Sequence, residues 1–329
     1  MLDDPGLDPR ELTAALSTGY GIEATAFAFV PGYDQRAASY AVTAIDGRWF
    51  AKVRFGAAPA VPLEVPRALL DAGVPNVLAP IHTRAGSLLH PMAGDRSLVA
   101  YPFATGRSAM EAGMTRDQWR TFGTTLLAVH DSGIDTVFAG RLPDQAFALP
   151  SAGEVRGVLS GLGTPRSGAA AERLDEVLRN QTERIGSMLD RAEALAAVLR
   201  SRPFERVLCH ADIHAANVLV TEDGGILLVD WDGPMLAPRE RDLLFVIGSR
   251  IARAVEPHEQ SWFFEGYGTV RVDPEALIFF RYERILEDIA EIGRSVFDVP
   301  GASEGSRAGE VRLLEGFFTP DALEAIERV

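Results

Sequence analysis

Residues 207–234 read VLCHADIHAANVLVTEDGGILLVDWDGP, which predicts two short apolar strands, at 218–221 and 226–229, joined by a Gly–Gly turn. Polar side chains lie in the loop before the first strand and directly after the second: Asp212, Asn217, Asp230 and Asp232. Loops anchored on paired strands bring distant polar groups together. We therefore expect these side chains to line one cleft.

This combination of groups suits phosphoryl transfer. A loop carboxylate such as Asp212 can accept the proton of an attacking hydroxyl group. The amide oxygen of Asn217 and the carboxylate of Asp230 are hard ligands of the kind that Mg²⁺ prefers. Phosphoryl transfer asks little more of a protein than positioning and charge neutralisation.

Lys52 is the only lysine among 32 basic residues, and it stands inside the apolar stretch RWFAKVRF, residues 48–55. A compact ammonium on a flexible stem can approach phosphate oxygens as a point charge, in a way that the planar guanidinium of arginine does not. The alternative is a lysine at the rim of the fold with its charged end in water. The uniqueness of Lys52 favours the phosphate-binding interpretation.

The organisation of the chain predicts an α+β fold with two lobes. Residues 1–103 are predicted to form a small N-terminal lobe with an antiparallel sheet, and residues 104–329 a larger and mainly helical lobe, with a hinge near 101–106. The predicted strands cover 24–30, 38–45, 48–55, 76–83 and 97–103. Predicted helices cover 8–18, 62–73 and 169–200, start at Thr115, and lie near 239, 257, 275 and 319, whereas 141–168 is predicted to be a loop.

Composition limits the partners. The net charge of −14 argues against nucleic-acid binding, which needs clustered basic residues, and is compatible with a cationic substrate. The sequence contains no apolar run of about 18 residues and no secretory signal, so we expect no membrane association. With Cys209 as the one cysteine, no internal disulfide can form, and a cytoplasmic location is expected. Cys209 itself is expected to be a small buried apolar residue.

The spacing His210-x-Asp212-x-x-x-x-Asn217, followed by Asp230 after an apolar strand, resembles the catalytic loop and metal-binding aspartate of protein kinases. In its detailed form the segment is more similar to the aminoglycoside phosphotransferase family. The stretches DWDGPMLAPRERDLLFVIG, FFEGYG and RYERILEDIAE resemble the spectinomycin phosphotransferases of that family. The resemblance extends from Leu12 to about Glu291 and implies the two-lobed protein-kinase-like fold.

The resemblance implies a role for each matching residue. Asp212 would be the catalytic base, Asn217 and Asp230 would hold Mg²⁺, and Lys52 would bind the phosphates of ATP with Glu64 as its partner. The residues implied to surround the rest of the nucleotide are Ala100, Tyr101 and Phe103, whose backbone would meet adenine, and Gly32 and Asp34, in a loop at the place of the glycine-rich loop.

The resemblance also implies a substrate site that includes Asp212, Trp231, Asp232, Glu283 and Glu287. Trp231 could stack on the substrate or could belong to the core. Glu283 and Glu287 could bind ammonium groups of a drug, or could form a solvated helix face paired with arginines. His210 is expected to be structural, tying the backbone of the loop.

The predicted function is therefore an ATP- and Mg²⁺-dependent kinase that phosphorylates a hydroxyl group of spectinomycin, a small cationic antibiotic, and so confers resistance. A kinase of another aminoglycoside, a macrolide, choline or a sugar is the nearest alternative. A nucleotide-binding regulator without catalysis is the alternative from another class. The protein is expected to be a monomer or a weak homodimer.

Overall fold

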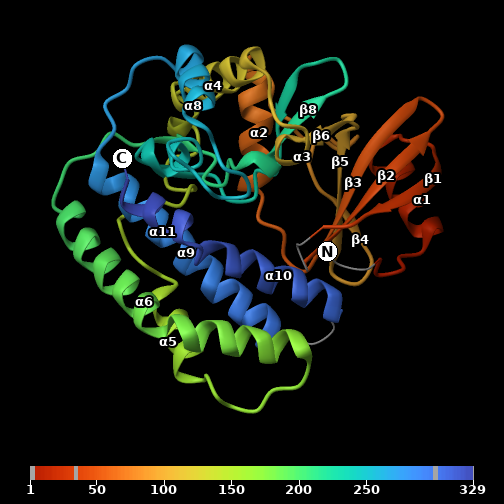
Figure 1. Ribbon diagram of the computed structural model, residues 1–329. Helices are drawn as coiled ribbons and strands as arrows, with labels where there is room; N and C mark the ends of the chain where they lie inside the picture. Colours follow the sequence, from red (N-terminus) through yellow and green to blue (C-terminus); the bar gives the residue numbers. More distant parts are fainter. Residues whose placement is uncertain (1–3, 33–35, 299–302, 329) are drawn as a thin grey trace. The chain divides into compact units, whose positions relative to one another are not determined.

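The computed structural model describes residues 4–32, 36–298 and 303–328 (Figure 1). These residues form two compact units, and neither unit is continuous in sequence. The first contains the described parts of Met1–Pro143, together with Leu208–Met235 and Ser261–Gly268. The second contains Asp144–Val207, Leu236–Gln260 and the described parts of Thr269–Val329. The first unit thus joins the predicted N-terminal lobe to residues 208–235, the polar segment that contains Asp212, Asn217 and Asp230.

An antiparallel sheet of five strands, in the order β1-β2-β3-β5-β4, dominates the described part of the first unit. Its strands are β1 (Ala24–Val30), β2 (Ala37–Ala44), β3 (Gly47–Phe55), β4 (His90–Met92) and β5 (Arg96–Pro102). Ile45 and Asp46 form the turn between β2 and β3, and Gly47 pairs with Ala44 as the first residue of β3. The sheet confirms four of the five predicted strands.

One face of this sheet is buried against helix α1 (Pro9–Tyr20). Strand residues alternate between the two faces, so every second side chain of β2 and β3 reaches this core. The core contains Leu12 and Leu16 of α1, Tyr40 and Val42 of β2, and Ala51 and Val53 of β3. Asp8 caps α1 by accepting a hydrogen bond from the Arg10 amide, and the left-handed Gly21 ends the helix. The opposite face of β3 is left for Lys52.

The polar segment forms a second, three-stranded sheet in the order β6-β8-β9 within the described residues. Its strands are β6 (Gly106–Ser108), β8 (Val218–Thr221) and β9 (Ile226–Leu228), and short helices α3 (Ala109–Ala112) and η2 (Ala215–Asn217) adjoin it. Strands β8 and β9 match the predicted pair closely. The first unit also contains α2 (Val61–Asp71), α4 (Arg116–His130) and η1 (Ile134–Thr136).

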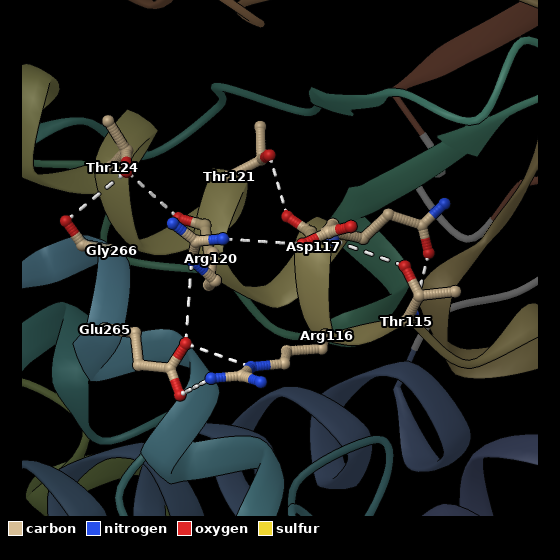
Figure 2. A network of polar contacts seen from close by, with 9 residues as sticks. Thr115, Arg116, Asp117, Arg120, Thr121, Thr124, Glu265 and Gly266 are labelled. Carbon is tan, nitrogen blue, oxygen red and sulfur yellow. Dashed lines mark hydrogen bonds and ion pairs between the residues drawn. The ribbon is translucent and has the colours of Figure 1, made fainter.

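Helix α4 and the end of α8 (Pro257–Tyr267) cross very closely. A Cβ atom on Gly123 would lie 2.1 Å from the Phe263 carbonyl oxygen, and one on Gly266 would lie 1.9 Å from the Arg120 carbonyl oxygen. Figure 2 shows the polar contacts beside this crossing, in which Arg116 donates to both carboxylate oxygens of Glu265. Two glycines therefore allow backbone to approach backbone here.

The second unit is mainly helical, and α9 (Pro274–Phe297) lies at its centre, in contact with α5, α6, α7, α10 and α11. Asp273 caps α9 by accepting hydrogen bonds from the amides of Glu275 and Ala276. The middle of α9 is buried on nearly all sides, as expected for a central helix. The surrounding helices are α5 (Ala152–Ser160), α6 (Ala169–Leu199), α7 (Glu240–Leu243), α10 (Glu304–Phe317) and α11 (Pro320–Glu327). The short strands β7 (Val207–Cys209) and β10 (Met235–Ala237) lie where the chain changes units.

Three secondary-structure predictions are wrong or incomplete. Residues 76–83 do not form a strand and make a single bridge, between Val77 and Leu228, because Asn76 is left-handed and Pro80 cannot donate a hydrogen bond. The predicted loop at 141–168 contains α5. Strand β4 and helix α10 were not predicted.

No helix in the described ranges is both long enough and apolar enough to cross a bilayer.

Candidate active site

Lys52 lies in the middle of β3, between Ser39 of β2 and Val99 of β5, on the sheet face opposite to α1. Its Nζ atom is 2.9 Å from Oδ2 of Asp232 and 3.7 Å from Oδ1 of Asp230, and only 13% of the side chain is exposed. The single lysine is therefore turned toward the acidic residues after β9, which is the arrangement that the sequence predicts. The low exposure of the Lys52 side chain argues against the alternative, in which its charged end lies in open solvent.

The Asp230-Trp231-Asp232 turn sends its two carboxylates to one side and its indole to the other. Trp231 is 4% exposed, donates from Nε1 to the Leu228 carbonyl, and contacts the His210 ring at 4.4 Å between centroids, with the two ring planes tilted by 48°. Asp230 has a φ angle of 62°, in the left-handed region that a residue with a Cβ adopts at some cost. The core position of Trp231 favours the packing role over substrate stacking.

The charges in this cluster act on the two carboxylates in different ways. Burial raises the pKa of Asp230, and the charge of Lys52 opposes that shift. Burial acts on Asp232 in the same direction, but the charges of Lys52 and Arg54 outweigh it and lower the pKa of Asp232. Asp232 is therefore the carboxylate that neutralises the cations, whereas Asp230 lacks a full counter-charge. A divalent cation beside Asp230 would supply that charge.

His210 holds the loop from His210 to Asn217 in place through both of its ring nitrogens. Its Nδ1 atom accepts a hydrogen bond from the Asp212 amide at 3.3 Å, and its Nε2 atom lies 2.9 Å from the Val229 carbonyl oxygen. An acceptor at Nδ1 and a carbonyl at Nε2 require the neutral ring with its proton on Nε2. Ala211 between them has a φ angle of 68°, so the loop turns sharply at this position. His210 is structural, as predicted, and Cys209 is buried, as predicted.

Asp212 and Asn217 lie side by side on this loop. Asn217 donates from Nδ2 to the Asp212 carbonyl at 2.8 Å and to its Oδ2 atom at 3.4 Å. His214 Nε2 is 3.5 Å from Oδ1 of Asp212, whose side chain is 37% exposed. Because the amide nitrogen of Asn217 donates to Asp212, its amide oxygen is not used in these two contacts. An amide oxygen and a carboxylate such as that of Asp230 are the kinds of ligand that Mg²⁺ prefers.

The other residues predicted to bind a nucleotide make different kinds of contact with the rest of the protein. Glu64, near the start of α2, forms an ion pair with Arg141, while Lys52 is paired with Asp232. The Ala100 carbonyl accepts a hydrogen bond from the Ile81 amide, and Phe103 lies under the guanidinium of Arg48.

The phenol of Tyr101 contacts the Phe50 ring edge-on, and burial raises the pKa of its hydroxyl. Gly32 is exposed after β1, and Asp34 lies outside the described residues. The assignment of these residues to nucleotide binding stays a prediction.

Glu283 and Glu287, which the family resemblance places in the substrate site, belong to α9 of the second unit. Glu283 is 2% exposed, and its Oε2 atom lies 3.6 Å from the Nη1 atom of the equally buried Arg241. Glu287 is 35% exposed and lies 3.4 Å from the same guanidinium. Burial raises the pKa of Glu283 to about 7, against the opposing charge of Arg241. These are not glutamates of a fully solvated helix face.

Two arginines in these clusters were not singled out in the sequence analysis. Arg54 pairs with Asp232 across 178 residues of sequence, and Arg241 lies between Glu283 and Glu287. Arginine is common in this chain, so composition gave no signal for either residue. The spacing of Arg54, two residues after Lys52 on the same strand face, was the one signal available.

Comparison with known proteins identifies the family of this chain. The profile of the phosphotransferase enzyme family, APH, matches residues 28–280. Protein StrN of Streptomyces griseus is 31% identical over 192 residues, which are 54% of this chain and 57% of StrN. This chain therefore spans a little over half the length of that relative.

Two solved structures illustrate the structural likeness. A crystal structure of spectinomycin phosphotransferase APH(9)-Ia in complex with ADP and spectinomycin has a TM-score of 0.87 and 29% identity, covering 98% of each chain. The amicoumacin kinase hAmiN in complex with AMP-PNP, Ca²⁺ and Ami has a TM-score of 0.62 at 17% identity, covering 96% of this chain and 95% of that one, and shows the fold alone. The predicted kinase-like α+β fold is confirmed.

Proposed function

We propose that this chain, which belongs to the phosphotransferase enzyme family, transfers the γ-phosphoryl group of ATP to a hydroxyl group of spectinomycin. The observation that carries the proposal is the convergence of Lys52, Asp230 and Asp232 in the unit that also holds the Asp212–Asn217 loop. The likeness to a spectinomycin phosphotransferase along nearly the whole chain supports the choice of substrate.

Each residue of the site has a separate role in the proposed reaction. Asp212 orients the substrate hydroxyl and accepts its proton as the oxygen attacks the γ-phosphorus; the bond from that phosphorus to the bridging oxygen breaks, and ADP leaves with the electron pair. Lys52 binds phosphate oxygens. Asn217 and Asp230 would hold Mg²⁺, which would neutralise charge on the phosphates. His210 keeps the loop in place through the Asp212 amide.

Two neighbouring carboxylates of the second unit, those of Glu283 and Glu287, support a cationic substrate. Glu283 and Glu287 carry two potential negative charges against one guanidinium, that of Arg241, so this group keeps an excess negative charge when both are ionised. Within the described residues, Glu283 Oε2 and Arg241 Nε and Nη1 are buried without a hydrogen-bond partner. Unsatisfied buried polar atoms are costly, and a bound polar ligand is one way to satisfy them. We propose that Glu283 and Glu287 bind an ammonium group of the drug.

The test is a reaction of the purified protein with Mg-ATP and spectinomycin, followed by mass spectrometry for the phosphorylated drug and by ADP release. We expect one phosphate per drug molecule. Asp212→Asn should lower the rate by about 10²- to 10⁴-fold while leaving ADP binding intact. Asp223→Asn, an exposed turn residue of the same segment, is the matched control and should leave the rate unchanged.

The same assay on a panel of aminoglycosides, macrolides, choline and sugars identifies the alternative kinases. Phosphorylation of a panel member with no reaction on spectinomycin would show that the substrate assignment is wrong. ADP binding without transfer to any of these acceptors would instead support a regulator.

A further inference from the structure

Arg54 and Lys52 bind the two oxygens of one carboxylate. Arg54 lies two residues after Lys52 on β3, so both side chains leave the same face of the sheet. Arg54 Nη2 donates to Oδ1 of Asp232, and Lys52 Nζ donates to Oδ2 at 2.9 Å. A single anionic group therefore sits in a fork made by two cations.

The cations in this fork are much less accessible than the anion. Lys52 and Arg54 are 13% and 12% exposed, whereas 41% of the Asp232 side chain is exposed. Two cations held this close and this far from water repel each other and need an anion between them. Asp232 supplies that anion from an exposed turn, so it is the member that another anion can replace.

A phosphate group resembles the carboxylate in the arrangement of its charged oxygens. Both present two or more charged oxygens on one central atom, and both are bound well by ammonium and guanidinium donors. The arrangement of Lys52 and Arg54 is therefore already suited to two oxygens of one phosphate.

We propose that Arg54 is a second phosphate-binding residue beside Lys52, and that Asp232 holds the phosphate position while no nucleotide is bound. This inference rests on the proposed function and adds a residue to its nucleotide site. On binding, Lys52 and Arg54 exchange the Asp232 carboxylate for phosphate oxygens. The released carboxylate stays next to Asp230, where the cation that accompanies a nucleotide compensates its charge.

Removal of Arg54 in the Asp232→Asn background separates a direct contact from an effect through Asp232. ADP with Mg²⁺ is titrated calorimetrically into wild type, Asp232→Asn, and the double variant Asp232→Asn/Arg54→Gln. If Arg54 acted only by restraining Asp232, its removal would have no effect once Asp232 is neutral. Because we infer a direct contact, the double variant should bind ADP about 10- to 100-fold more weakly than Asp232→Asn, as expected for a lost charge-assisted hydrogen bond.

Two further titrations complete the design. Adenosine, which lacks phosphates, should bind all three proteins within about twofold, since the contact involves phosphate alone. Arg67→Gln, which removes a partly exposed arginine paired with Asp71 on α2, is the control for loss of one positive charge and should bind ADP like wild type.

Equal ADP affinity in Asp232→Asn and the double variant, within about twofold, would overturn the inference, as would an equal loss for adenosine. Should the double variant not fold, Asp232→Asn titrated with ADP in EDTA still decides the matter, because without metal Asp232 only competes with phosphate. There we expect binding about tenfold tighter than in wild type, and unchanged binding overturns the inference. Wild type that fails to bind ADP at all would overturn the proposed function itself.

Discussion

Replacing Gly266 with alanine would place a methyl group against backbone at the crossing of α4 and α8. The new Cβ would lie 1.9 Å from the Arg120 carbonyl oxygen, 2.8 Å from its carbonyl carbon and 3.0 Å from its Cα. To reach an ordinary contact the two helices would have to separate by roughly 1.5 Å at this point. The obstacle is main chain rather than a flexible side-chain tip, so no rotamer change can relieve it.

The cost of this substitution follows from two opposing terms. Overpacking of a tight interface costs about 1–3 kcal/mol, and a backbone clash belongs at the upper end of that range. The better helix propensity of alanine returns about 1 kcal/mol. We therefore expect Gly266→Ala to lower the free energy of unfolding by about 2 kcal/mol. Urea unfolding followed by tryptophan fluorescence would show a midpoint lower by about 0.7 M for an m value near 3 kcal/mol/M.

A matched control lies on α6. Gly186 is also helical, but a Cβ atom there would meet nothing within 4 Å, so Gly186→Ala should be neutral or raise stability by up to about 1 kcal/mol. Gly123→Ala, on the other side of the same crossing, should resemble Gly266→Ala, and the two effects should be less than additive because both widen one gap. An unfolding midpoint for Gly266→Ala equal to or above wild type would refute the reasoning.

Three more outcomes test other parts of the molecule. Asp230→Asn should abolish the effect of Mg²⁺ on ADP affinity, because the amide removes a charged metal ligand. Metal-free ADP should bind more tightly than in wild type, since a carboxylate beside Lys52 no longer repels the phosphates, and calorimetry with and without EDTA would show both effects. Burial raises the pKa of Glu283 to about 7 in the folded state, so below this pH the folded state binds a proton that the unfolded state releases more easily. The free energy of unfolding should therefore fall as the pH rises through about 7. In Glu283→Gln this fall should be smaller, which urea unfolding at about pH 5 and about pH 8 would reveal. Arg281→Met should destabilise the protein by about 3 kcal/mol and expose the end of the chain to proteolysis, because this guanidinium donates to the carbonyls of Ile247, Ala325 and Ile326.

Local chemistry could be predicted from the sequence where it depends on neighbours in the chain. Strand β1 and the loop from His210 to Asn217 follow from alternation and spacing. The prediction of a strand at residues 76–83 was wrong, because an apolar run in the sequence does not reveal that Asn76 has a left-handed backbone conformation. Helix α5 was missed because Gly, Pro and Ser on both sides masked its short apolar face.

The sequence indicates Lys52 and the residues around Asp212 as candidates for the site, but neither Arg54 nor the pairing of the charged groups. The spacing around Asp212 predicts the catalytic loop, and the uniqueness of Lys52 marks it for function. Which carboxylate meets Lys52 is a matter of tertiary geometry, and the structure pairs it with Asp232 more closely than with Asp230. The burial of Glu283 against Arg241 depends likewise on helices that are distant in sequence.

The discontinuity of the first unit affects how the protein is made on the ribosome. The first 143 residues emerge without β8 and β9 and without the end of α8, which supplies Phe263 to contact Phe122 of α4 at 5.1 Å between ring centroids. Until residue 268 is synthesised, that aromatic surface has no cover, and nascent chains with exposed apolar surface are prone to aggregation. Expression at lower temperature or with added chaperones should therefore raise the yield of the full-length chain, and a fragment ending at residue 143 should be insoluble.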